Sequence, residues 1–496
     1  MTIDYDLLII GGGINGTGIA RDAAGRGHKV LLVEKDDLAS HTSSASTKLI
    51  HGGLRYLEQY EFRLVRESLA ERERLLILAP HLIKSMRFVM PLAKGMRPAW
   101  LIRAGLFLYD RLGGKSRLPK SKAVRLRGTP WGAGLKPIER GFVYSDGWVD
   151  DSRLVVLNAI GARDKGAEIR TRTAFLGATR EADRWLVRLD DGSEVTARAI
   201  VNAAGPWVGK LLSEIPGAAR ERPPRLVKGS HIIVPRLFDG EHAYILQNDD
   251  RRIIFAIPYE GEFTLVGTTD KPFSGDPATA TIDPDEVEYL CTAINRYFER
   301  ETAPADVVAS YSGVRPLYDD GSENASEVTR DYVLRLGMVE APQALSVFGG
   351  KITTYRRLAE QALDDFAPFL PAMGGHWTAN RPLPGGDLPG TIEEFVADVS
   401  RRWPWLGAHN ADRMARAYGT RIERLFVNGE KLGEDLGEGL FTAEVDYLVR
   451  EEWARTSDDI LCRRTKLGLH GGPALAARVE AYLASNSAAA EAPLRR

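Results

Sequence analysis

Three glycines near the start of the chain have the spacing of a nucleotide-binding turn. Gly11, Gly13 and Gly16, in the stretch GGGINGTG, fit the pattern G-x-G-x-x-G. In that pattern the first glycine permits a tight turn, the second lets a pyrophosphate approach the backbone, and the third lets a helix pack closely. Glu34 follows roughly twenty residues later, where an acidic side chain binds ribose hydroxyls. These residues predict a dinucleotide site; Glu34 argues against NADP, whose 2′-phosphate it would repel, and leaves NAD and FAD open.

The elements around these glycines support that prediction. Residues 5–10 form an apolar run, helical spacing then continues to Arg26, and HKVLLVEK follows as a second apolar run. Strand, glycine turn, helix and strand is the unit in which the pattern binds a nucleotide, whereas isolated glycines often serve only as turns. No second G-x-G-x-x-G with strand context follows, so a flavin held here would be reduced directly by a small organic substrate.

A second polar stretch, SSASTKLIHGGLRYL, covers residues 43–57. Its first half fits neither the strand period of two nor the helix period of 3.6. It has many hydrogen-bond donors and few bulky apolar side chains: hydroxyl residues come first, then Lys48, then His51 with two glycines, then Arg55 and Tyr56. We expect a loop that offers these donors to a ligand.

The rest of the chain divides into an antiparallel region, a second glycine junction and a helical end. Helical spacing covers residues 62–78, and the turn DDG separates two strand-like runs at 185–189 and 195–201. A mainly antiparallel sheet is predicted from RLVKGSHIIVP, AYILQ, IIFAIPY and FTLVGTTD. The runs YVLRL and ALSVF predict strands, GGKITTYR opens a helix, and the chain past Pro384 is helical.

Composition limits the class of protein. A length of 496 residues predicts two or three domains, and 44% hydrophobic with 27% charged residues is globular. The net charge of -1 argues against a nucleic-acid partner. Cys291 and Cys462 form no C-x-x-C, so neither a dithiol relay nor a Cys-rich zinc site is expected, and we predict no metal. The start MTIDYDLLII predicts a strand rather than a signal peptide, and no apolar run is long enough to span a bilayer.

Residues 97–127 are strongly basic, with Asp110 as their single acid, and contain PAWLIRAGLFLYDRL. Aromatic and aliphatic residues beside many cations can lie at an anionic membrane surface. An amphipathic core helix followed by a solvated basic loop would give the same pattern. Both interpretations stay open.

Six motifs together resemble the FAD-dependent glycerol-3-phosphate dehydrogenases, which are respiratory flavoproteins. The motifs are GGGINGTGIARDAAGRG, SSASTKLIHGGLRYLE, YSDGWVDDSRLV, KGSHIIVP, YSGVRPL and FGGKITTYR. The resemblance covers nearly the whole chain. It implies an α/β fold: a glutathione-reductase-like Rossmann FAD domain, an antiparallel-sheet substrate domain and a C-terminal all-helical cap. The corresponding expected ranges are 1–75, 140–205 and 330–370 for the FAD domain, 76–139 and 206–329 for the substrate domain, and 385–496 for the cap.

The resemblance also implies an activity. Members of the family oxidise sn-glycerol 3-phosphate to dihydroxyacetone phosphate and pass electrons through non-covalent FAD to quinone. It implies a cytoplasmic protein, peripheral on the cytoplasmic face of the inner membrane, and leaves a homodimer open. The alternatives are a glycerol-3-phosphate oxidase that uses oxygen, a related flavin amine oxidase, and a nucleotide-binding redox sensor without turnover.

A phosphorylated alcohol needs cations for its phosphate and a base for its hydroxyl proton. Arg55, Arg315 and Lys351 each lie beside glycine or proline at a predicted junction, although each could equally be a surface cation. Tyr56 and Thr268 are further candidates for substrate hydrogen bonds. His231, in KGSHIIVP, is the candidate base, with a structural strand histidine as the alternative. We therefore predict His231, Arg315 and Lys351 as catalytic; His51 is the rival base, but its place before Gly52 suggests flavin contact.

The expected cofactor-binding residues lie in five segments. The hydroxyl and lysine half of residues 43–57 is expected to wrap the phosphates and flavin of FAD, and the glycines after His51 are expected to let the chain pass close to the ring. The complete predicted set is Gly11, Gly13, Ile14, Asn15, Gly16, Glu34, Lys35, Thr42, Ser43, Ser44, Ser46, Lys48, Leu49, His51, Gly52, Gly53, Ala204, Gly205, Trp207, Gly350, Lys351, Ile352, Thr353 and Thr354.

Overall fold

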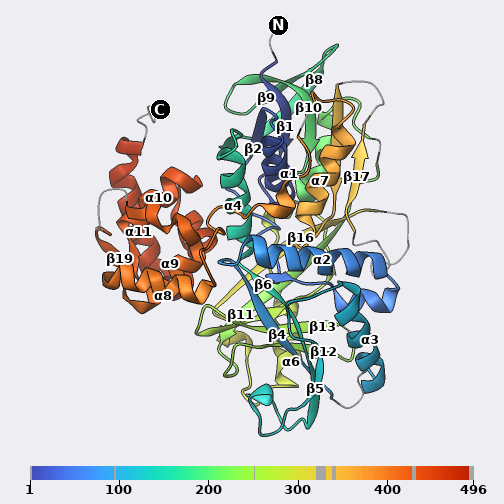
Figure 1. Cartoon of the computed structure of the whole chain (residues 1–496), viewed down its shortest axis with the longest axis vertical. Coiled ribbons are helices and arrows are strands. Elements are labelled where there is room, and N and C mark those ends of the chain that lie inside the picture. Colours follow the sequence, from blue (N-terminus) through green and yellow to red (C-terminus); the bar gives the residue numbers. More distant parts are fainter. Residues whose placement is uncertain are drawn as a thin grey trace.

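The structure is a computed structural model, which describes residues 3–93, 97–219, 221–250, 252–319, 331–337, 342–372, 374–426 and 432–490. Two large sheets share the body of the molecule, and a cluster of helices forms a separate lobe beside them (Figure 1). Within the described residues, every helix is too short or too polar to traverse a lipid bilayer.

The first sheet has eight strands and is parallel at its centre. Its order is β17-β18-β10-β1-β2-β7, and β9 pairs with β10 and β8. The runs YDLLII and VLLVE become β1 and β2, which are buried because a central parallel strand is covered on both faces. The strands are β1 (Tyr5–Ile10), β2 (Val30–Glu34), β7 (Glu168–Thr171), β8 (Phe175–Arg180), β9 (Trp185–Leu189), β10 (Glu194–Asn202), β17 (Val333–Leu336) and β18 (Gln343–Phe348).

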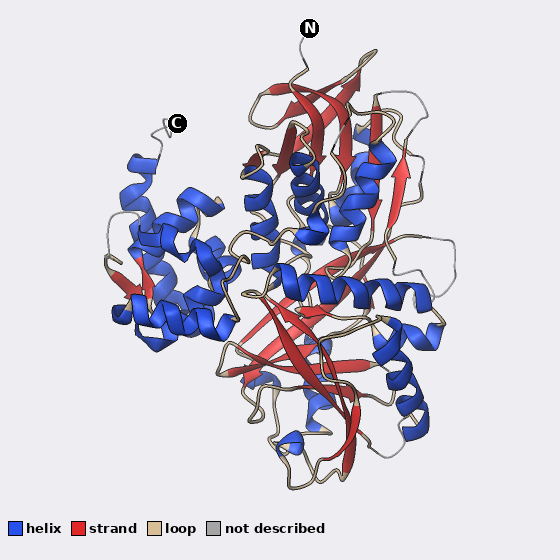
Figure 2. Cartoon of the chain, viewed as in Figure 1, coloured by secondary structure: helices blue, strands red, loops and turns tan. Residues whose placement is uncertain are grey.

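Three helices cover one face of this sheet: α1 (Ile14–Gly25), α4 (Asp151–Arg163) and α7 (Tyr355–Phe366). Helix α1 lies between the other two and is buried over almost its whole length, which explains why INGTGIARDAAG has no polar face. Side chains of β8 and β9 pack against the opposite face of β1 and β2. The helices and the sheet are visible as neighbouring layers in the upper half of Figure 2.

The second sheet has ten strands and is antiparallel except where β12 runs beside β4. Its order is β15-β11-β14-β13-β12-β4-β6-β3, with β16 paired to β11 and β5 to β6. The strands are β3 (Leu49–Ile50), β4 (Ile83–Pro91), β5 (Lys122–Arg125), β6 (Arg140–Val149), β11 (Arg225–Pro235), β12 (Ala243–Gln247), β13 (Ile253–Tyr259), β14 (Phe263–Gly267), β15 (Lys271–Pro272) and β16 (Ala309–Leu317).

Helices also cover the second sheet. On one face lies α6 (Pro284–Asn295), whose apolar side packs on β11, β13 and β14. On the other face lie α2 (Phe62–Leu78) and α3 (Ala99–Leu112), which place Val65, Leu69 and Leu106 in a shared core with the strands. A short helix, α5 (Val208–Leu211), follows β10.

The last part of the chain forms a helical domain with its own hydrophobic core. Its helices are α8 (Ile392–Arg402), α9 (Gly407–Tyr418), α10 (Thr442–Glu452), a π-helical turn at Asp459–Arg464, and α11 (Gly468–Ala490), which is kinked at Gly472. Two short strands, β19 (Asp435–Gly437) and β20 (Leu440–Phe441), pair with each other. Figure 1 shows this domain in orange and red beside α4.

The sequence predicted the elements of this fold well. The helix at 62–78, the strands on either side of the DDG turn and the helical end of the chain are confirmed. The strands departed from the expected domain ranges at two places, because β3 and β6 were expected with the FAD domain and both lie in the ten-stranded sheet. There β6 pairs with β3, β4 and β5. Its run RGFVYSDGWV alternates too weakly to indicate which sheet it joins, because both of its faces are covered.

Candidate active site

A cavity of about 1840 Å³ lies where the two sheets meet. Its wall is built from the glycine turn after β1, the loop after β2, residues 51–58, strands β11 and β16, the loop after β18 and one side of α3. Segments more than 300 residues apart in the chain therefore contribute to one site.

The glycine turn narrows one end of the cavity. Gly11 has a φ of 112°, and a Cβ atom added there would lie 2.5 Å from the carbonyl oxygen of Ala203. A Cβ at Gly16 would lie 2.0 Å from the carbonyl oxygen of Gly11. Only glycine fits at both positions, so the N-terminus of α1 can approach β1 and face the cavity, as an anion-binding turn requires.

Glu34 closes the same end of the cavity from β2. Its carboxylate accepts hydrogen bonds from the backbone N–H of Gly12 (2.6 Å) and of Asp36 (2.9 Å). Burial raises the pKa of Glu34, while those two N–H donors oppose the rise. A buried carboxylate that points along the cavity at a strand end is placed to accept hydrogen bonds from ribose hydroxyls.

Lys35, His41 and Trp207 form the outer wall next to Glu34. The Lys35 amine lies 4.6 Å from the Trp207 ring, and the His41 ring meets the same indole edge-on at 4.6 Å. Glu34, Asp36 and His41 are the one group within the described residues that could hold a metal ion. His41 is hydrogen-bonded to Asp36 (2.7 Å), and Glu34 accepts two N–H bonds, so these groups are satisfied by one another and by the chain.

The loop from Ser43 to Lys48 faces two ways. Ser43 lies on the cavity wall and accepts a hydrogen bond from the N–H of Ile14 (3.0 Å). Lys48 is buried behind the wall, where its amine pairs with Asp151 at 2.7 Å; Ser46 donates to the same carboxylate, also at 2.7 Å. The structure thus uses Lys48 to anchor the loop on the N-terminus of α4 rather than to line the cavity.

His51 lies on the cavity wall, beside the loop after β18. Its backbone N–H donates to Thr353 Oγ1 (3.2 Å), and its Nδ1 accepts from the N–H of Gly53 (3.1 Å). Burial, followed by the positive charges of Lys351 and Arg72, lowers the pKa of His51 to about 4. A neutral ring that accepts a backbone hydrogen bond fits a positioning role better than proton transfer.

The loop after β18 returns to the glycine turn. Asn15, in the first turn of α1, donates a hydrogen bond from Nδ2 to the carbonyl oxygen of Gly349 (3.1 Å). The next residues lead into the cavity, where the Lys351 amine lies 3.9 Å from the centre of the Tyr56 ring. This contact brings the second glycine junction to the end of the stretch at residues 43–57.

His231 lies on β11, opposite Gly267 of β14 and Tyr311 of β16. Its Nε2 is hydrogen-bonded to Thr47 Oγ1 (2.9 Å), and its ring stacks on Tyr311 at 4.8 Å. Burial, with the nearby charges of Lys48 and Arg315, lowers the pKa of His231 well below its ordinary value. The ring is therefore neutral at physiological pH and able to accept a proton.

All three cations predicted to bind phosphate lie on the wall of this one cavity: Arg55, Arg315 and Lys351. Arg315 is partly exposed, 3.4 Å from Asp270 Oδ1 and from the carbonyl oxygen of Thr269. Tyr56 and Thr268 lie on the same wall. The arrangement can hold a dianion beside an alcohol whose proton His231 takes.

Most of the predicted cofactor-binding residues line the cavity, and five do not: Gly16, Ser44, Lys48, Gly52 and Thr354. Gly16 packs on the glycine turn, Ser44 donates to the carbonyl oxygen of His41, and the N–H of Gly52 donates to the hydroxyl of Tyr109. Thr354 is buried and precedes α7. These residues support the wall from behind.

Three residues of the site, Thr47, Tyr311 and Asp151, were not predicted from the sequence. Thr47 and Tyr311 hold the His231 ring, and Asp151 anchors the loop at residues 43–48. A signal existed for Tyr311, because Tyr311 and Arg315 in YSGVRPL are four residues apart on one strand and so share a face. None existed for Asp151, whose role depends on contacts about a hundred residues away along the chain.

Two family descriptions cover nearly all of the chain. Residues 6–356 match the family described as FAD dependent oxidoreductase, and residues 376–486 match the C-terminal domain of alpha-glycerophosphate oxidase. The chain belongs to the FAD-dependent oxidoreductase family. The expected cofactor, FAD, and the expected fold class are thereby confirmed, and the cavity fits the cofactor: the glycine turn leaves no room for a Cβ atom, and Glu34 lies at the end of β2.

Relatives of this FAD-dependent oxidoreductase are named for their activities. It is 54% identical over 493 residues to the glycerol-3-phosphate dehydrogenase of Pseudomonas aeruginosa (97% of this chain, 95% of the relative). It is 50% identical over 477 residues to the aerobic glycerol-3-phosphate dehydrogenase of Escherichia coli (94% of each chain) and 52% identical over 475 residues to the D-erythritol 1-phosphate dehydrogenase of Brucella abortus (94% and 95%). The resemblance to the glycerol-3-phosphate dehydrogenases is thus confirmed.

A solved structure agrees with these relatives. The fold of this FAD-dependent oxidoreductase matches the glycerol-3-phosphate dehydrogenase from Bacillus halodurans complexed with FAD, with a TM-score of 0.74 and 26% identity. The match covers 99% of this chain and 96% of the other. The helical domain is therefore part of the shared architecture as well as the two sheets.

Proposed function

We propose that this FAD-dependent oxidoreductase oxidises sn-glycerol 3-phosphate to dihydroxyacetone phosphate. The observation that carries the proposal is the meeting of Arg55, Arg315 and Lys351 with His231 in the cavity that the glycine turn opens into. FAD, when bound, supplies the acceptor for the hydride that leaves the alcohol carbon. The cations supply what a phosphorylated substrate needs and favour it over a simple amine, which carries no anionic group for them to bind.

Each residue of the site has a distinct part in this proposal. The two arginines and Lys351 hold the phosphate, which orients the secondary alcohol. Tyr56 and Thr268 add hydrogen bonds from the wall. His231 takes the hydroxyl proton, and its Nδ1 makes no hydrogen bond with any residue that the structure describes. Because its pKa is low, the ring is in the proton-accepting form before substrate arrives.

The direct test is anaerobic addition of glycerol 3-phosphate to the holoenzyme. We expect loss of the visible absorbance of the oxidised flavin on a timescale faster than turnover. Glycerol without the phosphate is the control, because it lacks the group that the cations bind. A flavin that stays oxidised with glycerol 3-phosphate would contradict the proposal and would favour a redox sensor without this substrate.

D-Erythritol 1-phosphate is a second candidate substrate, favoured by the Brucella abortus relative that is 52% identical over nearly the whole chain. Both compounds carry a phosphorylated primary carbon next to a secondary alcohol, so the same cations and base suit both. The ratio of kcat/KM for the two substrates decides between them. We expect glycerol 3-phosphate to give the higher kcat/KM. A higher kcat/KM for D-erythritol 1-phosphate would make that compound the proposed substrate instead.

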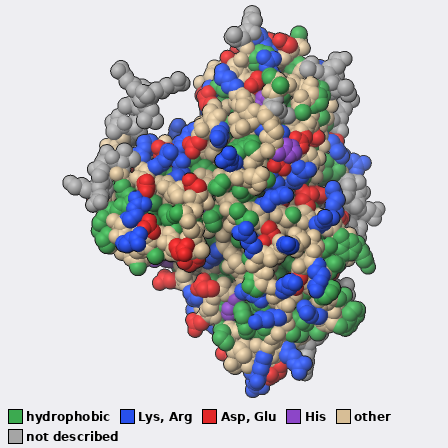
Figure 3. Space-filling view, viewed as in Figure 1, with side chains coloured by type: hydrophobic (Ala, Val, Ile, Leu, Met, Phe, Trp, Pro, Cys, Tyr) green, Lys and Arg blue, Asp and Glu red, His purple; other side chains and the backbone are tan. Residues whose placement is uncertain are grey.

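We further propose quinone as the electron acceptor and a membrane surface as the place of reaction. Trp100, Leu101 and Phe107 on α3 are 72%, 43% and 50% exposed. Figure 3 shows hydrophobic and basic side chains side by side along the edge of the molecule that carries α2 and α3. Leu101, Ile102 and Leu108 of the same helix line the cavity, so an apolar acceptor could reach it from a bilayer.

Two measurements test these finer points. Quinone reduction should exceed peroxide formation in air, whereas the opposite would favour an oxidase. Co-sedimentation with vesicles containing anionic lipid should weaken when Trp100 and Phe107 are changed to serine, because both lose apolar surface that is exposed in the structure. Attachment at the cytoplasmic face and a homodimer remain predictions from the family resemblance. Cell fractionation tests the first, and measurement of the molecular mass in detergent tests the second.

A further inference from the structure

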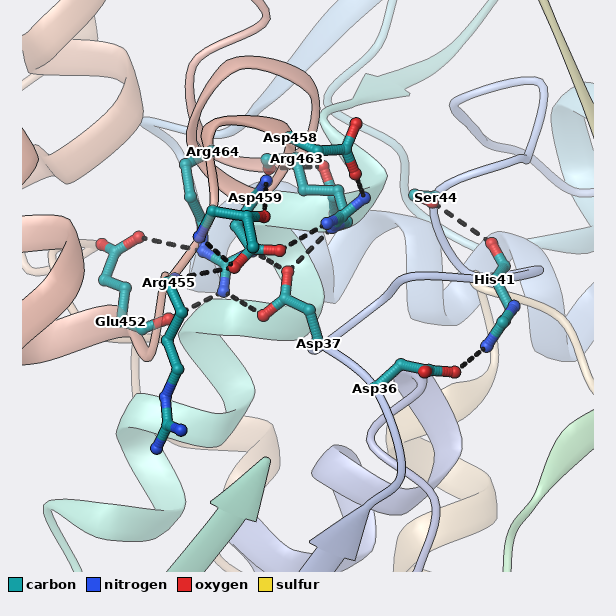
Figure 4. Close-up of polar contacts among 12 residues, drawn as sticks. Asp36, Asp37, His41, Ser44, Glu452, Arg455, Asp458, Asp459, Arg463 and Arg464 are labelled. Carbon is teal, nitrogen blue, oxygen red and sulfur yellow. Dashed lines mark hydrogen bonds and ion pairs between the residues drawn. The ribbon is translucent and has the colours of Figure 1, made fainter. Parts of the chain in front are cut away.

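One buried carboxylate of the FAD domain is held entirely from the helical domain. Asp37 lies in the loop after β2 and is 3% exposed. Arg464 donates to both of its oxygens, from Nη1 to Oδ2 at 2.8 Å and from Nη2 to Oδ1 at 2.7 Å. Arg463 donates from Nε to Oδ2, also at 2.8 Å. Figure 4 shows the two arginines reaching across to Asp37 from the π-helical turn. A carboxylate held by three charge-assisted bonds has a fixed position.

The two arginines are themselves held firmly. Arg464 is fully buried and also donates to the carbonyl oxygen of Glu452 (2.7 Å). Arg463 donates to Asp459 (2.6 Å), whose other oxygen accepts the backbone N–H of Arg455 (2.7 Å). Burial raises the pKa of Asp459, but the Arg455 N–H and the charged groups of Arg172 and Arg463 outweigh it and lower that pKa to about 2. The π-helical turn therefore presents both guanidinium groups to Asp37 in one arrangement.

Asp37 occupies the turn of a loop that forms the outer cofactor wall. Glu34 and Lys35 line the cavity just before it, and His41 lines it just after. The loop is tied to the glycine turn by the N–H of Ala39, which donates to the carbonyl oxygen of Gly12 (3.2 Å). A shift of Asp37 would therefore move both the acid expected at the ribose and the donors expected at the phosphates.

The helical domain also holds the far end of the same loop. Lys466 donates to Asp150 (2.8 Å) and to the hydroxyl of Ser152 (2.5 Å) at the start of α4. The residue between them, Asp151, binds Ser46 and Lys48. Four consecutive residues of the C-terminal segment, 463–466, thus include the groups that fix both ends of the loop at residues 35–48.

We propose that Arg463 and Arg464 are cofactor-positioning residues, which act through Asp37 to hold the loop at residues 35–48 in its FAD-binding form. The helical domain is then a part of the cofactor site, although none of the residues described for it lines the cavity. The inference depends on FAD binding in this cavity and is independent of which alcohol is oxidised. The competing account is that these ion pairs only fasten two domains together.

The test is Asp37→Asn in the full-length holoenzyme. Asparagine keeps the shape of the side chain and removes the charge that both arginines bind. We expect the dissociation constant for FAD to rise about tenfold, since each lost charge-assisted bond weakens the loop's hold. The measurement is the fluorescence of flavin released on dilution. The gain in melting temperature from added FAD should shrink in parallel.

Asp164→Asn is the matched control. Asp164 follows α4 at its other end and pairs with Arg421 of the helical domain (3.0 Å), so it joins the same two domains away from the loop. We expect it to lower the melting temperature without changing the FAD dissociation constant. If Asp37→Asn does no more than this control, the positioning role is overturned.

Arg463→Gln decides the matter if Asp37→Asn yields no folded protein. Arg463 is the more exposed of the two arginines and gives Asp37 a single bond, so its loss is milder. We expect roughly a threefold rise in the FAD dissociation constant, with Arg463→Lys recovering part of the affinity. An FAD affinity equal to that of the wild type would overturn the proposal. Because the readout is FAD release, a failure to oxidise glycerol 3-phosphate would leave this result intact.

Discussion

The two ends of the cavity are built in different ways. At the cofactor end, Gly11, Gly16 and Glu34 belong to one strand–turn–helix–strand unit of about thirty residues, and backbone contacts set their geometry. At the substrate end, His231 and Arg315 come from β11 and β16, which are joined by antiparallel pairing over nine residue pairs. The cofactor end is therefore formed by main chain from one short segment. The substrate end is formed by side chains that the sheet brings together from distant segments.

This difference predicts how each end tolerates change. A backbone cradle has no spare space, so an added atom collides with neighbouring main chain and distorts the surface that the cofactor would contact. A side chain on a rigid strand can be shortened while the strand stays in place, because ladder hydrogen bonds hold it. Substitutions at the cofactor end should therefore remove FAD, and those at the substrate end should change kinetics while FAD remains bound.

The largest effect should come from Gly11→Ala. Alanine at a φ of 112° is strained by about 1–3 kcal/mol, and its Cβ would lie 2.5 Å from the Ala203 carbonyl oxygen. We expect purified protein with most of its flavin lost, measured as the ratio of visible to ultraviolet absorbance. Gly27→Ala is the control: Gly27 also has a positive φ, but its Cβ would meet nothing within 4 Å. Full flavin content in Gly11→Ala would contradict the local account of this end.

His231→Ala tests the substrate end. Loss of a general base lowers rates by about 10²–10⁴-fold, so we expect anaerobic flavin reduction to slow by that factor with flavin content unchanged. His242→Ala is the control, because His242 is also a buried histidine, directly before β12 of the same sheet, but packs among Phe238 and Tyr244, away from the cavity. Reduction at the wild-type rate would remove His231 from the role of base.

The contrast between the ends also explains what could be predicted from the sequence. The glycine turn and Glu34 were predictable because their chemistry depends on spacing within one short unit. The cavity wall at Arg55, Arg315 and Lys351 was predicted through whole-chain resemblance to a family; spacing alone left each as a surface cation. Strand pairing between distant segments is what places them on one wall, and no local pattern encodes it.

The residues that were not predicted act through other residues. Asp151 holds Lys48, and Asp37 is held by Arg464, over separations of 103 and 427 positions. Charged residues of these kinds are ordinarily solvated, so nothing in the sequence marks them as buried partners. Lys48 shows the consequence: its position in a polar loop suggested phosphate contact, and the fold instead buries it against α4.

Arg315→Ala should have a smaller effect than loss of the base. Removal of one cation from a phosphate site weakens binding by about 1.5–3 kcal/mol, which corresponds to roughly 10–150-fold in kcat/KM. We expect this loss to appear as a higher KM for glycerol 3-phosphate, with the flavin content of the variant equal to that of the wild type. Arg225→Ala is the control, since Arg225 lies on the neighbouring strand β11 and pairs with Asp319, off the cavity wall. Unchanged steady-state kinetics in Arg315→Ala would place the phosphate elsewhere.

The smallest effect concerns His51, which lies where the two ends meet. Its pKa is lowered to about 4 in the folded protein, from 6.5, chiefly by burial and then by Lys351. Between these pH values the unfolded chain binds a proton that folded His51 does not, so the stability from the neutral ring is complete above pH 6.5 and is lost as the pH falls through 4. A difference of about 2.5 pKa units corresponds to a loss of roughly 3 kcal/mol of stability below pH 4.

His51→Asn removes this titration while keeping an acceptor near the position of Nδ1, which binds the N–H of Gly53. We expect the melting temperature of the variant to fall less steeply than that of the wild type between pH 6.5 and pH 4. The exposed residue His409, changed to asparagine, is the control. If the melting temperatures of His51→Asn and of the wild type fall equally with decreasing pH, protonation of His51 does not cause the loss of stability in acid. The acid sensitivity would then belong to another buried group, such as His81 between α2 and β4, whose pKa burial lowers to about 3.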